Sequence, residues 1–366
     1  MDWRVPQVDP YIDDTELTAT TDVIRRGWLT EGPHAADFLS AVRADTGARY
    51  AVLAPNGTLG LFLAFLALDL PRDSEILVPT FTFYGSVTAA IFAGLKPVFV
   101  DADPETFNVD VDLLDAVVTE RTAAVMPVHI YGHSPPLDRI MEFAARRRLA
   151  VIEDAAQGYG VTYQGRHAGT WGDVGMISFF ADKTITMGEG GVVLTDDGAL
   201  YHRLRLLRNQ GRLNSGTFVH DDLGMNFRVT DLQCAVGLAQ VRKAPEIVAR
   251  KQATHARYVT NLSGVPGARW LQIQQGSTLV PFRFALLSQR RERLVVELEH
   301  AGIQTRRFFC PMHQQPMLQR YAKGSFPVAD SLYADGVLLP VHHAVSDCDV
   351  DEICEIVRKV HSDSIG

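Results

Sequence analysis

The sequence predicts an α/β protein with a mostly parallel, doubly wound sheet and a smaller C-terminal α+β domain. Short apolar runs alternate with helical patterns from Tyr50 to Glu153, which is typical of successive strand–helix–strand units. One run, Leu149 to Gln157, ends in acidic residues, as a buried parallel strand does at its carboxyl end. The chain has 366 residues, 46% of them hydrophobic, enough for one large domain and a smaller one.

Composition excludes several classes of protein. The net charge is −8 with acids and bases interspersed, so we expect neither a nucleic acid nor an anionic membrane as a partner. No apolar run approaches the ~20 residues of a membrane span, and Met1 to Pro6 lacks the apolar centre of a signal peptide. The four cysteines form no Cys-x-x-Cys pair, so we expect reduced thiols, a cytoplasmic location and no metal site.

The N-terminal region is predicted to form two helices followed by a strand. Helical spacing covers Asp13 to Arg26 and His34 to Thr46, and a glycine- and proline-rich turn, residues 27–33, separates them. Tyr50 to Ala54 then has the composition of a strand. Asn56-Gly57-Thr58 opens an apolar helix that runs to Leu68. Such a helix start exposes backbone N–H groups and a hydroxyl, which suits either a phosphate or an ordinary N-cap.

The next units repeat the strand–helix pattern. Glu75 to Pro79 predicts a strand, and the aromatic Phe83 follows it. A ring at that place is either part of the core or a surface on which a planar ligand stacks. A helix to Phe92 and a strand from Pro97 to Val100 complete this unit.

A further strand, Ala123 to Val128, ends at His129, which we interpret as a structural histidine at the same sheet edge. The helix Asp138 to Arg147 leads back to the strand that carries Glu153 and Asp154. Asp154 either caps a helix or presents a carboxylate to a ligand at the carboxyl edge of the sheet.

Lys183 lies in a setting that is unusual for a lysine. Phe179 and Phe180 precede it, and Gly188-Glu189-Gly190-Gly191 leads into the strand Gly191 to Thr195. A lysine held away from water loses its proton more readily and becomes a candidate Schiff-base former. A carboxylate such as Asp154 on a neighbouring strand end would keep a pyridine nitrogen protonated. The pair therefore indicates pyridoxal 5′-phosphate (PLP), with pyridoxamine phosphate (PMP) as its aminated form.

These motifs together resemble the nucleotide-sugar aminotransferases, PLP enzymes of the aspartate-aminotransferase fold. The resemblance rests on Glu153-Asp154-Ala155-Ala156-Gln157, on Gly172-Asp173, and on Ser178-Phe179-Phe180 with Lys183 and its glycine turn. It extends over Pro6 to Val357. Within the family, Lys-Thr-Ile-Thr followed by Gly-Glu-Gly-Gly most resembles the GDP-perosamine synthases, which aminate a 4-keto-6-deoxy sugar.

The resemblance implies roles for individual residues. Lys183 would be the catalytic lysine and Asp154 the partner of the ring nitrogen. Phe83 would stack on the ring, and Gln157 would lie beside it. The coenzyme phosphate would be held by Gly57, Thr58, Ser178 and Asn226. Asn226 stands in Gly-Met-Asn-Phe-Arg, where the family has tyrosines in place of Met225 and Phe227, and it would reach the site of a partner chain. Substrate contacts are expected from Thr30, Tyr84 and His313.

The C-terminal part is expected to form the second domain. After a helix from Ala199 to Arg208, residues 209–222 read as a loop over the site. A long helical stretch, Thr230 to Leu262, is expected to break at Pro245, and we place the domain boundary there: 1–245 and 246–366. A strand at Val280–Leu286 and a helix at Arg290–Ala301 follow.

The expected reaction is transfer of an amino group from L-glutamate to the C4 ketone of a nucleotide-linked 4-keto-6-deoxy hexose, giving an amino sugar and 2-oxoglutarate. The expected assembly is a homodimer with shared active sites. Two alternatives remain. A sugar dehydratase on this fold would carry a histidine in place of Lys183, and a regulatory protein that kept the fold would have lost the cofactor residues. The sequence leaves open whether the nucleotide is GDP, dTDP or UDP, and whether C4 or C3 is aminated.

Overall fold

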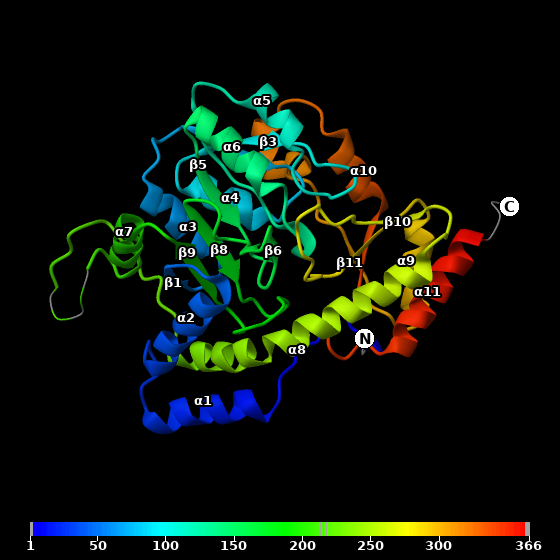
Figure 1. The fold of residues 1–366 in the computed structure, drawn as a ribbon, viewed down its shortest axis with the longest axis horizontal. Helices are drawn as coiled ribbons and strands as arrows, with labels where there is room; N and C mark the ends of the chain where they lie inside the picture. Colours follow the sequence, from blue (N-terminus) through cyan, green and yellow to red (C-terminus); the bar gives the residue numbers. More distant parts are fainter. Residues whose placement is uncertain (1–2, 213, 215, 217, 363–366) are drawn as a thin grey trace.

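A computed structural model describes residues 3–212, 214, 216 and 218–362. Its centre is a seven-stranded sheet in the order β1-β9-β8-β5-β4-β2-β3 (Figure 1). β8, β5, β4, β2 and β3 are parallel neighbours, whereas β9 runs antiparallel to both β1 and β8. The predicted mostly parallel α/β sheet is confirmed.

The strands of this sheet are β1 (Tyr50–Ala54), β2 (Glu75–Pro79), β3 (Lys96–Val100), β4 (Thr122–Val125), β5 (Ala150–Asp154), β8 (Val174–Ser178) and β9 (Gly191–Thr195). The helices that precede β1, connect the strands or follow β9 are α1 (Asp14–Arg26), α2 (Pro33–Thr46), α3 (Gly57–Leu68), α4 (Tyr84–Phe92), α5 (Leu114–Val117), α6 (Leu137–Arg147) and α7 (Gly198–Arg208). A two-stranded hairpin, β6 (Thr162–Tyr163) and β7 (Arg166–His167), follows β5.

Alternating side chains of each strand enter cores on opposite faces of the sheet. In β2, Ile76 and Val78 pack with α3 and α4, whereas Leu77 packs with α6 on the other face. Ala35 and Phe38 of α2 pack in a further core with side chains of β1, β8 and β9. Because both faces are covered, the central residues of the strands are mostly apolar, as expected of a doubly wound sheet.

The C-terminal part has its own antiparallel sheet, in the order β10-β11-β13-β12. Its strands are β10 (Ala268–Trp270), β11 (Phe284–Ser288), β12 (Arg306–Arg307) and β13 (Gly336–Leu339), and its helices are α9 (Arg291–His300), α10 (Pro327–Asp335) and α11 (Asp347–Ser362). The end of α8 (Asp231–Leu262) contributes Tyr258 and Leu262 to the core between this sheet, α9 and α11.

The expected break at Pro245 is wrong. α8 continues through this proline and has 32 residues in all. Proline removes one backbone hydrogen bond, and packing offsets that loss: α8 contacts α1 and α2 near its start and α11 near its end (Figure 1). The helix thus links the two sheets, and a division of the chain at residue 245 stays a prediction.

Two predicted strands are shifted. β4 ends at Val125 rather than Val128, since Pro127 has no N–H to donate to a ladder. β11 begins at Phe284, four residues later than predicted. The preceding N–H groups of Val280 and Phe282 donate instead to the carbonyl oxygens of Gly132 and Tyr131, at 2.9 and 3.0 Å. These contacts join the C-terminal part to the main sheet.

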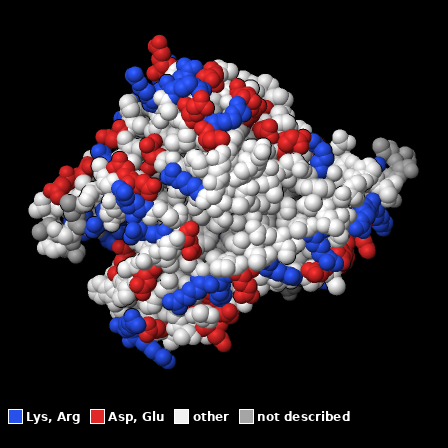
Figure 2. All heavy atoms as spheres, in the orientation of Figure 1, with Lys and Arg blue, Asp and Glu red and all other residues white. Residues whose placement is uncertain are grey.

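Charged side chains of both signs are mixed around the face shown in Figure 2, and the centre of that face is a broad area without charge. Within the described ranges, no helix is both long and apolar enough to cross a membrane.

Candidate active site

A cavity of about 520 Å³ lies at the carboxyl ends of the parallel strands, where ligands bind in open α/β sheets. Asp154 is the last residue of β5 and Ser178 is the last residue of β8, while Val128 and His129 follow β4. The first turn of α3 and the segment after β2 complete the main-sheet side. The C-terminal part adds Phe282, Arg283, Arg306, Arg307 and Phe309. This volume is in the usual range for a small-molecule site.

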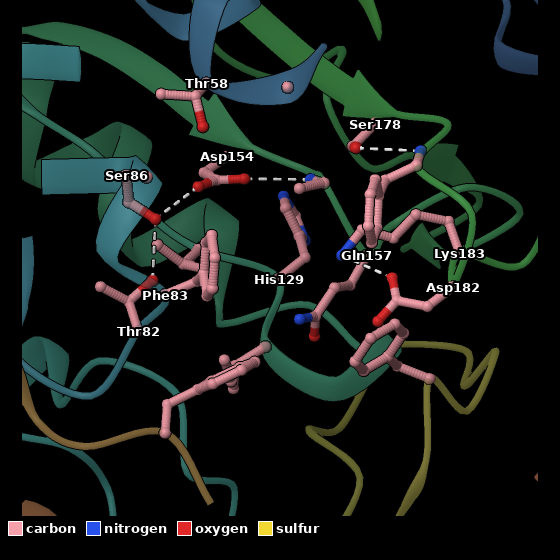
Figure 3. A pocket seen from close by; sticks show the side chains of 18 of the residues that line it. Thr58, Thr82, Phe83, Ser86, His129, Asp154, Gln157, Ser178, Asp182 and Lys183 are labelled. Atoms are coloured by element: carbon pink, nitrogen blue, oxygen red, sulfur yellow. Dashed lines mark hydrogen bonds and ion pairs between the residues drawn. The ribbon is translucent and has the colours of Figure 1, made fainter. Parts of the chain in front are cut away.

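The Asp154 carboxylate is fixed by two donors at the cavity wall. Ser86 Oγ donates to its Oδ2 at 2.6 Å, and the backbone N–H of Ala156 donates to Oδ1 at 3.0 Å. Thr82 in turn hydrogen-bonds Ser86 at 2.9 Å. A carboxylate has about four acceptor sites, so Asp154 can still accept a bond from a cationic N–H in the cavity (Figure 3).

Lys183 approaches the cavity from the side opposite Ser86 and Phe83 (Figure 3). Its side chain is 16% exposed, and Nζ lies 3.6 Å from Asp182 Oδ1 and 4.5 Å from the centre of the Phe282 ring. Burial lowers the pKa of the Lys183 ammonium below its ordinary value, although the charges of Asp182 and Asp154 partly oppose this. The amine is therefore closer to its nucleophilic, uncharged form than a surface lysine would be.

The upper end of the cavity in Figure 3 is built from Thr58 and Ser178, next to Gly57. Asn56 caps α3, since its side chain accepts from Leu59 N at 2.9 Å. The N–H groups of the first helical turn have no acceptor within the helix and favour an anion. A Cβ on Gly57 would lie 3.0 Å from Ser178 Cβ, and one on Gly85 would lie 2.6 Å from Thr58 Oγ1. Glycine at both positions keeps this end open.

His129 and Gln157 form the floor between Asp154 and Lys183 (Figure 3). The imidazole Nε2 pairs with Glu153 Oε2 at 2.9 Å, and both side chains are fully buried. Burial alone raises the pKa of the Glu153 carboxyl, but His129 and backbone N–H donors hold it below its ordinary value. The second ring nitrogen, Nδ1, is buried without a hydrogen-bond partner. His129 is thus structurally paired, as expected, and its Nδ1 is enclosed by protein.

Arginines form the wall contributed by the C-terminal part. Arg283 is 3% exposed, its Nη2 lies 3.5 Å from Asp182 Oδ2, and burial lowers its pKa to about 10. Arg306 Nη1 lies 3.9 Å from the same carboxylate oxygen. A negatively charged substrate is therefore compatible with this wall despite the acidic chain. No local sequence pattern predicts a site role for Arg283, because this side chain meets Asp182 only through the contacts of residues 280–282 with the segment after β4.

The predicted residues that line this cavity are Gly57, Thr58, Phe83, Asp154, Gln157, Ser178 and Lys183. Phe83 is 57% exposed, so its ring is available for stacking. Gln157 Oε1 accepts from Tyr131 N at 2.6 Å, which fixes the amide orientation.

Four predicted residues are absent from the cavity lining of their own chain: Thr30, Tyr84, His313 and Asn226. His313 is engaged elsewhere, with Nδ1 2.8 Å from Thr80 Oγ1, Nε2 2.8 Å from Asp330 Oδ1 and its ring stacked on Phe326. Thr30 and Asn226 lie on exposed segments.

The loop 209–222 also differs from expectation. Its described residues do not line the cavity, and Figure 1 shows the chain after α7 extending away from the sheet. Residues 213, 215 and 217 lie outside the described residues.

The chemistry of this cavity fits PLP. A buried lysine of lowered pKa faces an anchored carboxylate, an exposed aromatic ring flanks them, and a glycine-lined helix start suits a phosphate.

Comparisons with known proteins identify one family of aminotransferases. The sequence pattern of the DegT/DnrJ/EryC1/StrS aminotransferase family matches residues 10–358. The GDP-perosamine synthase of Escherichia coli O157:H7 is 34% identical over 367 residues, covering 98% of this chain and 99% of that protein. The crystal structure of DesV from S. venezuelae superposes with a TM-score of 0.93 at 29% identity, covering 98% of this chain and 100% of that one. A GDP-4-keto-6-deoxymannose-3-dehydratase whose structure traps PLP and glutamate shares the fold, with a TM-score of 0.92 at 24% identity over 97% of this chain and all of that one.

Proposed function

The chain belongs to the DegT/DnrJ/EryC1/StrS family of PLP-dependent sugar aminotransferases, and we propose that it transfers the amino group of L-glutamate to the C4 ketone of a nucleotide-linked 4-keto-6-deoxy hexose. The amino nitrogen leaves the Cα of glutamate, which becomes 2-oxoglutarate, and replaces the ketone oxygen of the sugar. A GDP-linked sugar is favoured, because the relative from E. coli O157:H7 is a GDP-perosamine synthase.

One observation carries the proposal: the Asp154 carboxylate, at the end of β5, and Lys183, in the loop after β8, line the same cavity. When bound, PLP supplies an aldehyde that takes up an amino group and a ring that accepts electrons. Asp154 would pair with the ring nitrogen, Phe83 would cover a ring face, and Gln157 would lie beside the ring. Gly57, Thr58 and Ser178 would hold the phosphate.

Lys183 would carry the proton that moves during transfer. Burial favours the uncharged amine, which can accept a proton from the substrate, and Asp182 at 3.6 Å stabilises the ammonium formed. Arg283 and Arg306 share Asp182, so the charge near Nζ stays balanced. The centre of the Phe282 ring lies 4.5 Å from Nζ and gives this end of the cavity an apolar surface.

The substrates are anionic, and the arginine wall suits them. Glutamate has two carboxylates, and a nucleotide-linked sugar carries a diphosphate. Arg306 and Arg307 lie at the cavity wall with roughly half of each side chain exposed, so an incoming carboxylate or phosphate can reach both, although Arg307 already pairs with Glu292 at 2.8 Å. Tyr84 stands next to Phe83 and is 39% exposed, and we propose it as a sugar contact at the opening of the cavity.

A direct test offers the purified enzyme L-glutamate with GDP-, dTDP- and UDP-linked 4-keto-6-deoxy sugars in parallel and identifies products by mass spectrometry. We expect an amino sugar and an equal amount of 2-oxoglutarate, fastest with the GDP sugar. Lys183→Ala should lose nearly all turnover, since it removes both the anchor and the base. Near-normal transamination by that variant would refute the assignment of Lys183.

The same assay separates the alternatives. A deoxygenated sugar in place of an amino sugar would identify a dehydratase. A non-catalytic protein would show no change in coenzyme absorbance when glutamate is added. Amination of the dTDP or UDP sugar alone would retain the aminotransferase and correct only the nucleotide.

A further inference from the structure

A second, smaller cavity of about 30 Å³ lies behind the loop that carries Lys183. Asp182, Lys183 and Thr184 form one wall, and residues 8–11 of the N-terminal segment form another. His342 and His343, which follow β13, close it. Within the described part of the chain, one trio of metal-type side chains is compact: Asp9, His342 and His343, whose ligand atoms all lie within 4.8 Å of one another.

The hydrogen bonds of the two histidines determine which nitrogen of each is free. His342 Nε2 lies 2.9 Å from the carbonyl oxygen of Pro6, so it must carry the hydrogen and donate. Its Nδ1 then holds a lone pair, and this atom is buried without a partner in a residue that is 8% exposed. His343 Nδ1 likewise lies 3.2 Å from the carbonyl oxygen of Asp9, which leaves Nε2 with the lone pair.

Metal-binding histidines have this arrangement, with one nitrogen donating to a carbonyl or carboxylate and the other facing the ion. We propose that Asp9, His342 and His343 form a site for a divalent transition cation of the Zn²⁺ type. Two imidazoles and a carboxylate suit Zn²⁺, and water can complete the four ligands. Ligand distances of about 2.0–2.2 Å would draw the three atoms closer together than they lie now.

Charges of both signs surround the cavity: Asp9 and Asp182 are acidic, and Lys183, Lys251 and Arg283 are basic. Asp9 supplies a negative charge, and both Asp9 and His343 are partly exposed, which provides an entry path. Lys251 also borders the cavity, but its Nζ donates to the carbonyl oxygen of Val341 at 3.0 Å. Tyr11 stacks on His343 with ring centres 4.7 Å apart and holds that imidazole in place.

The proposed ion would have a structural role. It would fasten the N-terminal segment, already paired with the C-terminal part through Val5 and Ile303, to the turn after β13. The Lys183 loop packs on the same cavity, so the ion would also brace this loop without touching the substrate. The proposal does not depend on which sugar the enzyme aminates, because metal binding is measured without substrate.

The test is calorimetric titration of untagged, chelator-treated enzyme with Zn²⁺, and with Co²⁺ while its visible ligand-field bands are recorded. We expect saturation at one ion per chain and cobalt bands typical of nitrogen and oxygen ligands in a low-symmetry site. Asp9→Asn keeps the side-chain shape, and His343→Phe keeps the stacking on Tyr11. Each should weaken binding by more than about tenfold, the effect of losing even an outer partner of a metal ligand.

Two exposed residues serve as matched controls. Asp14→Asn and His300→Gln remove the same kinds of group elsewhere and should leave the titration unchanged. Thermal unfolding should show a Tm that rises with metal concentration for the parent and both controls, but not for Asp9→Asn or His343→Phe. Absence of saturable binding, or equal binding by Asp9→Asn and the parent when both are folded, would overturn the proposal.

Discussion

The role proposed for Asp154 depends on its charge and on how precisely that charge is held. Ser86 and the Ala156 N–H leave acceptor capacity directed into the cavity. A carboxylate in that position stabilises a protonated ring nitrogen, whereas a neutral amide does not. The difference between Asp and Asn at residue 154 therefore measures the electrostatic part of the proposed chemistry.

We predict that Asp154→Asn lowers kcat by roughly 10²–10³, the usual effect of removing one preorganised electrostatic group. Steady-state kinetics with glutamate and the best keto sugar measures it. Ser86→Ala should have a smaller effect in the same assay, because it loosens the carboxylate without removing it. Equal kcat for Asp154→Asn and the parent, with coenzyme bound in both, would contradict the role given to Asp154.

The pKa of Lys183 leads to a second prediction. Burial lowers this pKa, and the charges of Asp182 and Asp154 partly oppose that effect. Removing the Asp182 charge should lower the pKa further, so in Asp182→Asn the amine becomes uncharged at a lower pH than in the parent. Competitive acetylation of coenzyme-free protein across a pH series, quantified for the Lys183 peptide, gives the midpoint.

Asp69→Asn, a change at an exposed residue far from the cavity, serves as the control and should leave the midpoint in place. A midpoint that moves to higher pH in Asp182→Asn would show that Asp182 does not stabilise the ammonium.

At the scale of elements, the contact of residues 131–132 with residues 280–282 positions the arginine wall. Gly132 has φ +93°, and a Cβ there would lie 1.9 Å from the carbonyl oxygen of Val280. The carbonyl oxygens of Tyr131 and Gly132 accept the hydrogen bonds from Phe282 N and Val280 N that place Phe282 and Arg283 beside Lys183. This crossing therefore links the fold to the site.

We predict that Gly132→Ala destabilises the protein by about 3 kcal/mol or more, since both backbone strain and a backbone clash must be relieved. Gly47→Ala is the matched control: its φ is +74°, but no atom lies within 4 Å of the added Cβ, so about 1 kcal/mol is expected. Urea unfolding at fixed protein concentration compares the two. Equal losses would mean that the segment 280–282 moves away without cost.

Elements with local signals were predicted closely. Asp13 caps α1 with a capping box, and β1, β2 and β9 have the predicted bounds, because caps and apolar runs are local features of sequence. The grouping of Lys183 with Asp154 also followed, since carboxyl ends of neighbouring parallel strands share one edge. Arg283 could not be placed this way: it meets Asp182 across 101 residues through a crossing with no periodic pattern. The Asp9–His342–His343 trio could not be predicted either, because it brings together residues from opposite ends of the chain.

At the scale of the whole molecule, the predicted site residues Thr30 and Asn226 lie on neighbouring segments that do not line the cavity of their own chain. The turn that holds Thr30 is joined to the segment after Asn226, because Asp231 N donates to the carbonyl oxygen of Leu29 at 3.0 Å. Large apolar side chains are exposed on these segments, with Trp28 at 61% and Met225 at 53%. Such exposure is typical of an interaction surface. We propose that a second copy of the chain covers it and receives Asn226 at its phosphate end.

This proposal predicts complementation between two defective chains. Lys183→Ala removes the proposed catalytic lysine. Asn226→Asp retains the acceptor for Arg228 N, now at 3.1 Å, but places a negative charge against the partner's phosphate. Each variant alone should be nearly inactive. In a mixed dimer with shared sites, one site collects both defects and the other has neither, so equal co-expression should restore about a quarter of the parent activity. If each chain builds its whole site, every site in the mixture keeps one defect and activity stays low, whereas full activity of Asn226→Asp alone would remove Asn226 from the site.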